Sequence, residues 1–85
     1  MLRINSRPGD CGERLELEGR LTHAYVPELE RVVVEARDRS SLVTLDLAEL
    51  TFLDAEGFGL LRRLQGQEVR IHGCSAFVAE LLGLP

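Results

Sequence analysis

The chain has 85 residues, of which 45% are hydrophobic and 28% are charged, and its formal net charge at pH 7 is −4. This length closes one hydrophobic core and leaves no room for a second, so we expect a single domain over residues 1–85. The acidic balance, without a run of Lys or Arg, argues against a nucleic-acid partner, because proteins that bind this polyanion carry a basic stripe.

No apolar stretch approaches the roughly 18 residues that span a bilayer, and no basic amphipathic face is present. The N-terminus begins with a strand-like alternation and shows no signal-peptide pattern. We therefore expect a cytoplasmic protein without direct membrane insertion. The cysteines, Cys11 and Cys74, are scattered relative to His23 and His72 and form no zinc-binding spacing, so we expect reduced thiols and no metal or cofactor.

The first half of the chain predicts a hairpin followed by an amphipathic helix. Apolar and polar residues alternate at 2–5 and again at 14–18, as they do in half-buried strands, and turn-forming residues separate the two segments. Apolar residues then recur with helical spacing over 25–37. Pro27 falls where a first helical turn tolerates it, so we predict that the helix begins close to this residue.

The middle of the chain predicts a central strand that leads into a second helix. Residues 42–47 are apolar enough for a strand in the centre of the sheet. We interpret 48–53 as a bridge that contributes two further buried side chains, Phe52 and Leu53. Leucines and a phenylalanine at helical spacing then predict a helix near 56–64.

The last part predicts a strand at 68–72 and a short helix at 76–82, with Ser75 as N-cap and Gly83 just after the end. The order β-β-α-β-α-β-α favours an α/β fold with a mixed sheet of about four strands and helices packed mainly on one side. The predicted core includes Leu45, Leu47, Phe58, Leu61, Ile71 and Leu81.

The sequence shows no recognised catalytic motif. Ser75 lacks the glycine setting of a nucleophile elbow, and His23 and His72 have no acid or nucleophile at a meaningful spacing. The Gly-Phe-Gly at 57–59 lacks the longer glycine pattern and the lysine of a phosphate-binding loop. We therefore expect a protein that is not an enzyme.

Residues 45–61, LDLAELTFLDAEGFGLL, form the most informative stretch. They resemble the signature of the STAS family, the anti-sigma factor antagonists and their relatives, in which D-L-x-x-[LV]-x-[FY]-[LIM]-D-S-S-G-[LF] runs from the central strand into a helix. Residues 17–22, LEGRLT, are similar to the family's L-x-G-x-L-D step, with Thr22 at the position of the Asp. Residues 69–75 resemble the strand and turn that follow, so the resemblance covers nearly all of the chain and implies a STAS-like fold.

The resemblance implies a domain that docks onto a protein partner at the loop and helix start after the central strand. The residues themselves fit such a helix start. A carboxylate in front of a helix can cap its free N–H groups, and a glycine in the first turn suggests close approach by another backbone or by a partner. The expected partner-binding residues are Asp54, Ala55, Glu56, Gly57 and Phe58.

The motif departs from the family at its phosphorylation site. The regulated phosphoacceptor is the residue after the aspartate, and here it is Ala55, which has no hydroxyl. Glu56 occupies the next position, which is usually serine. It lies about 100° around a helix from the acceptor and is therefore a poor mimic of a phosphoserine. We expect a degenerate phosphosite and a domain that is always competent to bind.

Three functions remain open from the sequence. The resemblance favours an anti-sigma factor antagonist-like regulator of transcription in bacteria, whose partner is an anti-sigma factor or related kinase-like regulator. The alternative is a cytosolic accessory subunit of a lipid-type ABC transporter, with the ATPase subunit as partner. STAS domains that resemble this subunit also carry a residue other than serine at the acceptor position. The third possibility is a nucleotide-binding sensor, but nothing in the sequence resembles a phosphate-binding loop.

Overall fold

The computed structural model describes residues 1–9 and 12–83 and contains, within them, four strands, three α-helices and one short 3-10 helix. The predicted order of strands and helices is confirmed. The elements are β1 (Leu2–Gly9), β2 (Gly12–Leu21), η1 (His23–Tyr25), α1 (Val26–Arg39), β3 (Val43–Leu53), α2 (Ala55–Gly66), β4 (Arg70–His72) and α3 (Ala76–Leu82).

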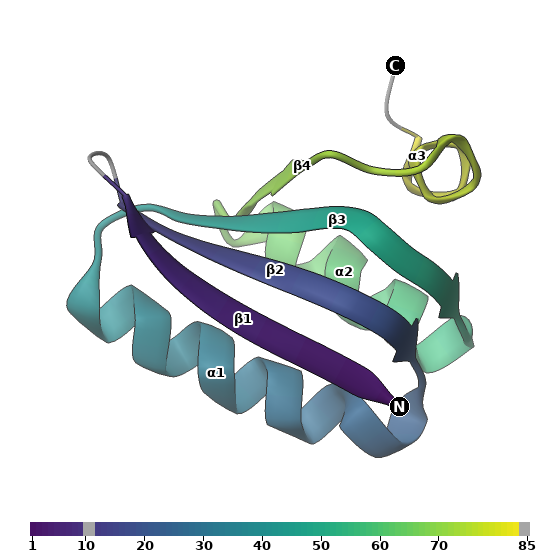
Figure 1. Cartoon of the computed structure of the whole chain (residues 1–85), viewed down its shortest axis with the longest axis horizontal. Helices are drawn as coiled ribbons and strands as arrows, with labels where there is room; N and C mark the ends of the chain where they lie inside the picture. The colour runs from purple at the N-terminus through teal and green to yellow at the C-terminus, as the bar shows by residue number, and fades with distance from the viewer. Residues whose placement is uncertain (10–11, 84–85) are drawn as a thin grey trace.

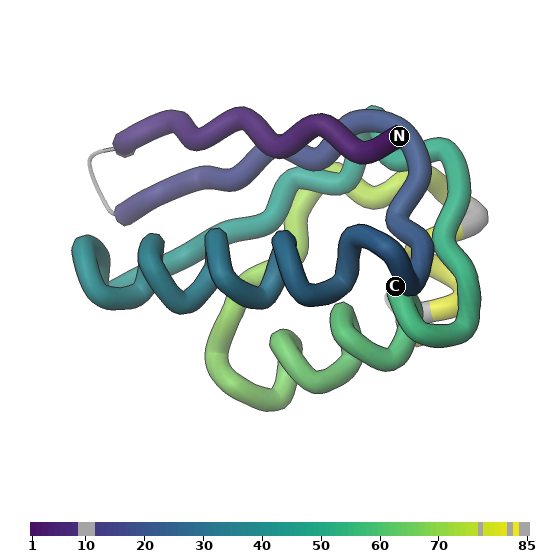
Figure 2. Tube along the Cα trace, turned by 90° about the horizontal axis from the view of Figure 1, so that it is seen from below, coloured from purple at the N-terminus to yellow at the C-terminus, as the bar shows by residue number. Residues whose placement is uncertain are grey.

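The four strands form one mixed sheet in the order β1-β2-β3-β4. β1 pairs with β2 antiparallel, whereas the β2–β3 and β3–β4 pairs are parallel. Helices α1 and α2 lie side by side on one face of this sheet, and α3 lies near the C-terminal end of β3 (Figures 1 and 2). The expected mixed sheet with helices mainly on one side is therefore confirmed.

The hydrophobic core lies between the sheet and the two long helices. Leu15 and Leu17 of β2 and Leu45 and Leu47 of β3 are fully buried, because alternate strand residues point toward the helices. The helices cover them with Leu29, Val33 and Ala36 from α1 and Leu60, Leu61 and Leu64 from α2.

Of the six predicted core residues, three are fully buried, two are partly buried and one is exposed. Leu45, Leu47 and Leu61 are completely buried, while Phe58 and Ile71 are partly buried and pack against the core. Leu81, however, is 41% exposed. Among the side chains of α3 that the structure describes, Val78 is the buried one, since a helix of seven residues presents only a narrow face to the protein.

Residues 48–53 were expected to form a bridge, but they continue β3 to Leu53. The pairing with β2 shifts register twice along this stretch, so exposed residues come in pairs and the strand alternation is broken. The expectation that Phe52 is buried is wrong: it is 39% exposed, with the guanidinium of Arg20 lying 4.6 Å from its ring centre. Leu53 is buried as predicted.

The element ends follow the local chemistry of the sequence. Pro27 lies in the first turn of α1, as proline requires. The Ser75 hydroxyl accepts a hydrogen bond from the backbone N–H of Val78 and caps α3, and Gly83 ends this helix in the left-handed conformation. No helix in the described part of the chain has the length and hydropathy needed to cross a membrane.

Candidate docking site

Asp54 joins three elements at the end of β3, through its carboxylate and its backbone N–H. One oxygen accepts a hydrogen bond from the backbone N–H of Gly57 at 2.8 Å and so caps α2. The other accepts from the backbone N–H of His23 in η1 at 2.9 Å. The Asp54 backbone N–H donates to the carbonyl oxygen of Leu21 at the end of β2. The start of α2 is therefore fixed to the sheet by the residue that the sequence identified as a cap.

These hydrogen bonds favour the ionised form of Asp54. The donor from Gly57 contributes most, and the N–H and ring of His23 add to it, so the pKa of Asp54 lies below its ordinary value. The His23 ring nitrogen Nδ1 is 3.7 Å from the same carboxylate. The Asp54 side chain is 29% exposed, which makes it only partly available to a partner.

Gly57 lies beneath this site, where α2 packs against the end of β2. It is buried, and a Cβ placed on it would lie 2.7 Å from the carbonyl oxygen of Leu21 and 2.9 Å from Leu21 Cγ. The close approach expected from the sequence is therefore made by the backbone of β2. Gly57 lets α2 pack tightly against the sheet, and a large residue at this position would displace the helix.

The surface of the site is formed by Ala55, Glu56 and Phe58. Ala55 and Glu56 are exposed on the first turn of α2, and Phe58 is half-buried. The Arg62 guanidinium lies 5.9 Å from the centre of the Phe58 ring, one turn further along the helix. A side chain at position 55 thus points out of the fold, where an attached group would meet a partner and not the core.

An apolar hollow of about 240 Å³ lies beside this surface. It is lined by Leu53, Asp54, Ala55, Phe58 and Leu81, which come from β3, the cap, α2 and α3. Three of the predicted partner-binding residues therefore line one concave surface. Sequence reasoning missed the contribution of Leu81, which it placed in the core, and of His23, which it left without a partner.

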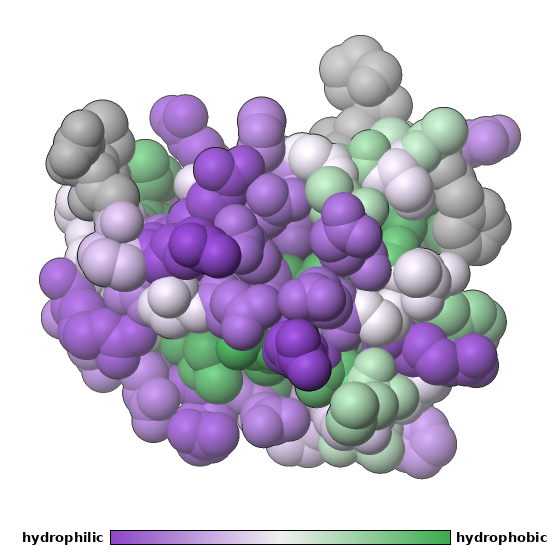
Figure 3. Space-filling model, viewed as in Figure 1, coloured by the Kyte–Doolittle hydropathy of each residue, from purple (hydrophilic) through white to green (hydrophobic). Residues whose placement is uncertain are grey.

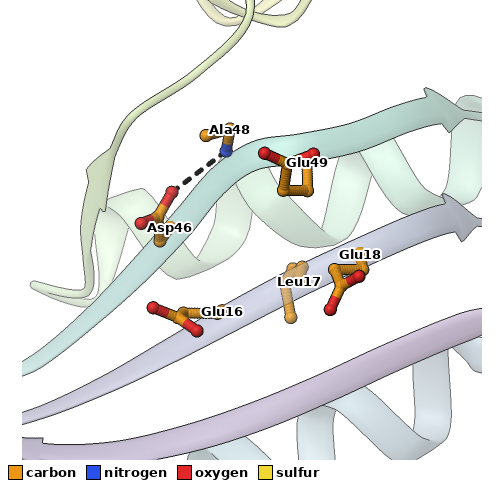
Figure 4. A pocket seen from close by; sticks show the side chains of 6 residues that line it. All are labelled: Glu16, Leu17, Glu18, Asp46, Ala48 and Glu49. Carbon is orange, nitrogen blue, oxygen red and sulfur yellow. Dashed lines mark hydrogen bonds between the residues drawn. The ribbon is translucent and has the colours of Figure 1, made fainter.

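A second hollow, of about 190 Å³, lies on the open face of the sheet. Glu16 and Glu18 of β2 and Asp46 and Glu49 of β3 project from this face, away from the helices (Figure 4). Arg7 pairs with Glu16 at 2.8 Å, and Arg14 pairs with Asp46 at 2.9 Å.

The open face is therefore a mixed, largely paired charged surface, and hydrophilic residues dominate the middle of the view in Figure 3. Asp46 also accepts a hydrogen bond from the Ala48 backbone N–H. Such a face is typical of a sheet side that stays in contact with water.

The cysteine and metal expectations can be followed only in part, because Cys11 lies outside the described residues. Cys74 is a free thiol, and burial together with the nearby charge of Asp46 raises its pKa, which keeps it protonated and weakly reactive. Among residues 1–9 and 12–83, no three His, Cys, Asp or Glu side chains come together as metal ligands.

Comparison with known proteins agrees with this architecture. A family model described as "Mlab, STAS domain" matches residues 6–84. The fold is similar to that of the anti-sigma factor antagonist SpoIIAA in its unphosphorylated form, with a TM-score of 0.70 and 18% identity over 95% of this chain and 82% of that one.

A second solved structure, an uncharacterised protein from Shewanella loihica PV-4 with a SpoIIAA-like fold, has a TM-score of 0.62 and 17% identity, over 89% of this chain and 69% of that one. No curated protein sequence matches the chain significantly. The family model covers nearly the whole sequence, so the chain belongs to the STAS family.

Proposed function

We propose that this STAS domain is a non-enzymatic docking module of the anti-sigma factor antagonist type, which binds a protein partner through the start of α2. The observation that carries the proposal is the position of Ala55. It is exposed on the first turn of α2, beside an apolar hollow, at the point where the family resemblance places the phosphoacceptor. The partner is an anti-sigma factor or a related kinase-like regulator.

The chemistry of position 55 defines how the module is controlled. Phosphorylation of a serine there would add a charge of about −1.5 to −2 at the helix start. Alanine accepts no phosphate and presents a small neutral surface, which corresponds to the unmodified state of the family. We propose that the domain stays competent to bind and that its abundance, or the state of the partner, sets the output. This role belongs to transcription regulation in the bacterial cytoplasm.

The contact surface in this proposal is smaller than the five-residue motif. Ala55, Glu56 and Phe58 touch the partner, because their side chains are exposed or half-buried at the start of α2, and Ala55 and Phe58 also line the hollow. Asp54 and Gly57 act mainly inside the domain: one caps α2 and holds η1, and the other admits the backbone of β2. Leu81 of α3 completes the apolar wall.

A second candidate function is that of an accessory subunit that docks onto the cytosolic ATPase of a membrane transporter. Ala55 favours it as much as it favours the first, since STAS domains that resemble the small subunit of lipid-transport ABC systems also carry a residue other than serine at this position. The same surface of α2 would be used, with a different partner.

The test is affinity capture from the cells in which the chain is naturally made, with the parent, Ala55→Asp and Val34→Asp compared. Val34 is 59% exposed on α1, so it places the same new charge away from the hollow. We expect the parent and Val34→Asp to retain one partner and Ala55→Asp to lose it. A soluble kinase-like protein identifies the first function and a membrane-associated ATPase the second. Equal retention by Ala55→Asp would contradict docking at this surface.

A further inference from the structure

The hollow at the start of α2 combines apolar walls with one lining carboxylate, that of Asp54. Its walls are Leu53, Ala55, Phe58 and Leu81, contributed by three different elements. Leu81 is 41% exposed and lies beside Phe58, so the apolar wall of the hollow is open to solvent. The hollow is open to solvent and has a volume of about 240 Å³, which is of the size of one large apolar side chain.

Two acidic residues are sequence neighbours of residues that line this hollow. Glu56 follows Ala55 on the first turn of α2, and Glu80 precedes Leu81 on α3; both are exposed. Asp54 lines the hollow itself and is held in its ionised form by two backbone donors. Two basic side chains also lie beside residues that line the hollow: the Arg62 guanidinium is 5.9 Å from the centre of the Phe58 ring, and His23 Nδ1 is 3.7 Å from the Asp54 carboxylate. The chain as a whole carries a net charge of −4, which adds to the same field.

We propose that the segment that fills this hollow presents one large apolar side chain flanked by Lys or Arg residues, which lie against Glu56 and Glu80. The inference rests on the proposed function, because it specifies the partner's side of the same surface. An apolar anchor in a pocket supplies most of the affinity of a small interface, while charges at its rim select the partner and speed association. An acidic segment would instead bring like charges together at both rims.

The probe is a pair of synthetic helical peptides that share one central leucine and differ only in the flanking residues, three Lys in one and three Glu in the other. Each peptide is titrated into the isotope-labelled full chain, and the backbone amide resonances are followed by NMR. We expect the Lys peptide to shift the amides of Ala55, Phe58 and Leu81 and to bind about threefold to tenfold more tightly than the Glu peptide. Added salt should reduce this difference, since exposed charges are screened.

The variant Glu56→Lys/Glu80→Lys decides the role of the two rim carboxylates. Both side chains are exposed, so the fold should be retained, which circular dichroism verifies. We expect this variant to prefer the Glu peptide. Leu81→Ser serves as the second variant and should weaken both peptides by a similar factor, because it removes part of the apolar wall and leaves the rim charges in place.

The outcomes separate this inference from the docking proposal. Equal binding of both peptides at the hollow would overturn the charge preference and leave docking at this surface intact. Shifts centred on Glu16 and Asp46 would overturn the inference in favour of the open face of the sheet. Absence of shifts with either peptide would also overturn it, while capture of the natural partner by Ala55→Asp, with Val34→Asp as the control, decides docking independently.

Discussion

The two ends of the sheet are held by different chemistry. Where β2 begins and α1 ends, the buried carboxylate of Glu13 receives two hydrogen bonds from the Arg39 guanidinium, at 2.6 and 3.1 Å. The Ser6 hydroxyl of β1 donates to the same carboxylate. Glu13 is only 7% exposed, so this end is closed by a charged clamp made entirely within the chain.

At the opposite end, where β2 and β3 finish and α2 begins, the donors to the carboxylate are backbone N–H groups and not a guanidinium. The Asp54 carboxylate binds the N–H groups of His23 and Gly57, and the Gly57 backbone packs against Leu21. These contacts leave Ala55 and Leu81 facing outward at the hollow. The difference teaches that the polar groups at one end close the fold, whereas those at the other end position the apolar surface that we propose as the docking site.

The largest effect is expected from the core on which both ends rest. Leu61 is fully buried in α2, and Leu61→Ala should lower the free energy of unfolding by about 2–5 kcal/mol, the range for truncating a core leucine. In a domain of 85 residues this is a large part of the total stability. Leu81→Ala is the matched control, and chemical denaturation should show a clearly smaller loss because Leu81 is 41% exposed. Equal losses would mean that the core has been wrongly placed.

Two glycines in α2 test how tightly this helix packs against the end of the sheet near Asp54. Gly57→Ala should destabilise the domain by about 1–3 kcal/mol, since the new Cβ meets the Leu21 carbonyl oxygen and the surrounding structure must shift. Gly59→Ala should stabilise it by about 0.5–1 kcal/mol, because nothing lies within 4 Å of its Cβ position and alanine favours the helix. Melting temperatures that move in the same direction for both variants would contradict the tight packing at Gly57.

Glu13 tests the closed end. Glu13→Gln removes the charge that receives the Arg39 and Ser6 hydrogen bonds, and should cost about 1–3 kcal/mol in unfolding free energy. Glu16→Gln is the matched control, because the Glu16–Arg7 pair is more exposed and such surface pairs contribute about 0–1 kcal/mol. A Glu13 variant as stable as the control would show that the clamp contributes little.

Acid should weaken both ends through the same mechanism. The pKa of Glu13 is lowered first by its hydrogen bonds from Arg39, and that of Asp54 by the N–H of Gly57, from ordinary values of 4.5 and 3.8. A lowered folded-state pKa gives stability that is present above the ordinary value and is lost as the pH falls through the folded value. The unfolding free energy should therefore decline below about pH 4.5. Glu13→Gln should flatten this decline, and an unchanged profile would contradict it.

The sequence predicts the fold well because the apolar periodicity of α1, α2 and β2 is regular. It predicts the cap at Asp54 because that function depends on a residue and its nearest neighbours. It fails where long-range packing decides, as at Phe52, whose strand is interrupted by register shifts, and at Leu81, whose short helix turns it outward. The Glu13–Arg39 clamp joins residues 26 positions apart, a distance at which no local pattern signals a contact.

The most direct test of the account concerns position 55 itself. The dissociation constant of the captured natural partner is measured for the parent, Ala55→Ser and Ala55→Asp. We expect Ala55→Ser to bind as the parent does and Ala55→Asp to bind at least about tenfold more weakly, which corresponds to about 1.4 kcal/mol. Equal affinity of all three proteins, or phosphate on the parent from its own cells together with loss of binding, would contradict a permanently competent docking surface at Ala55.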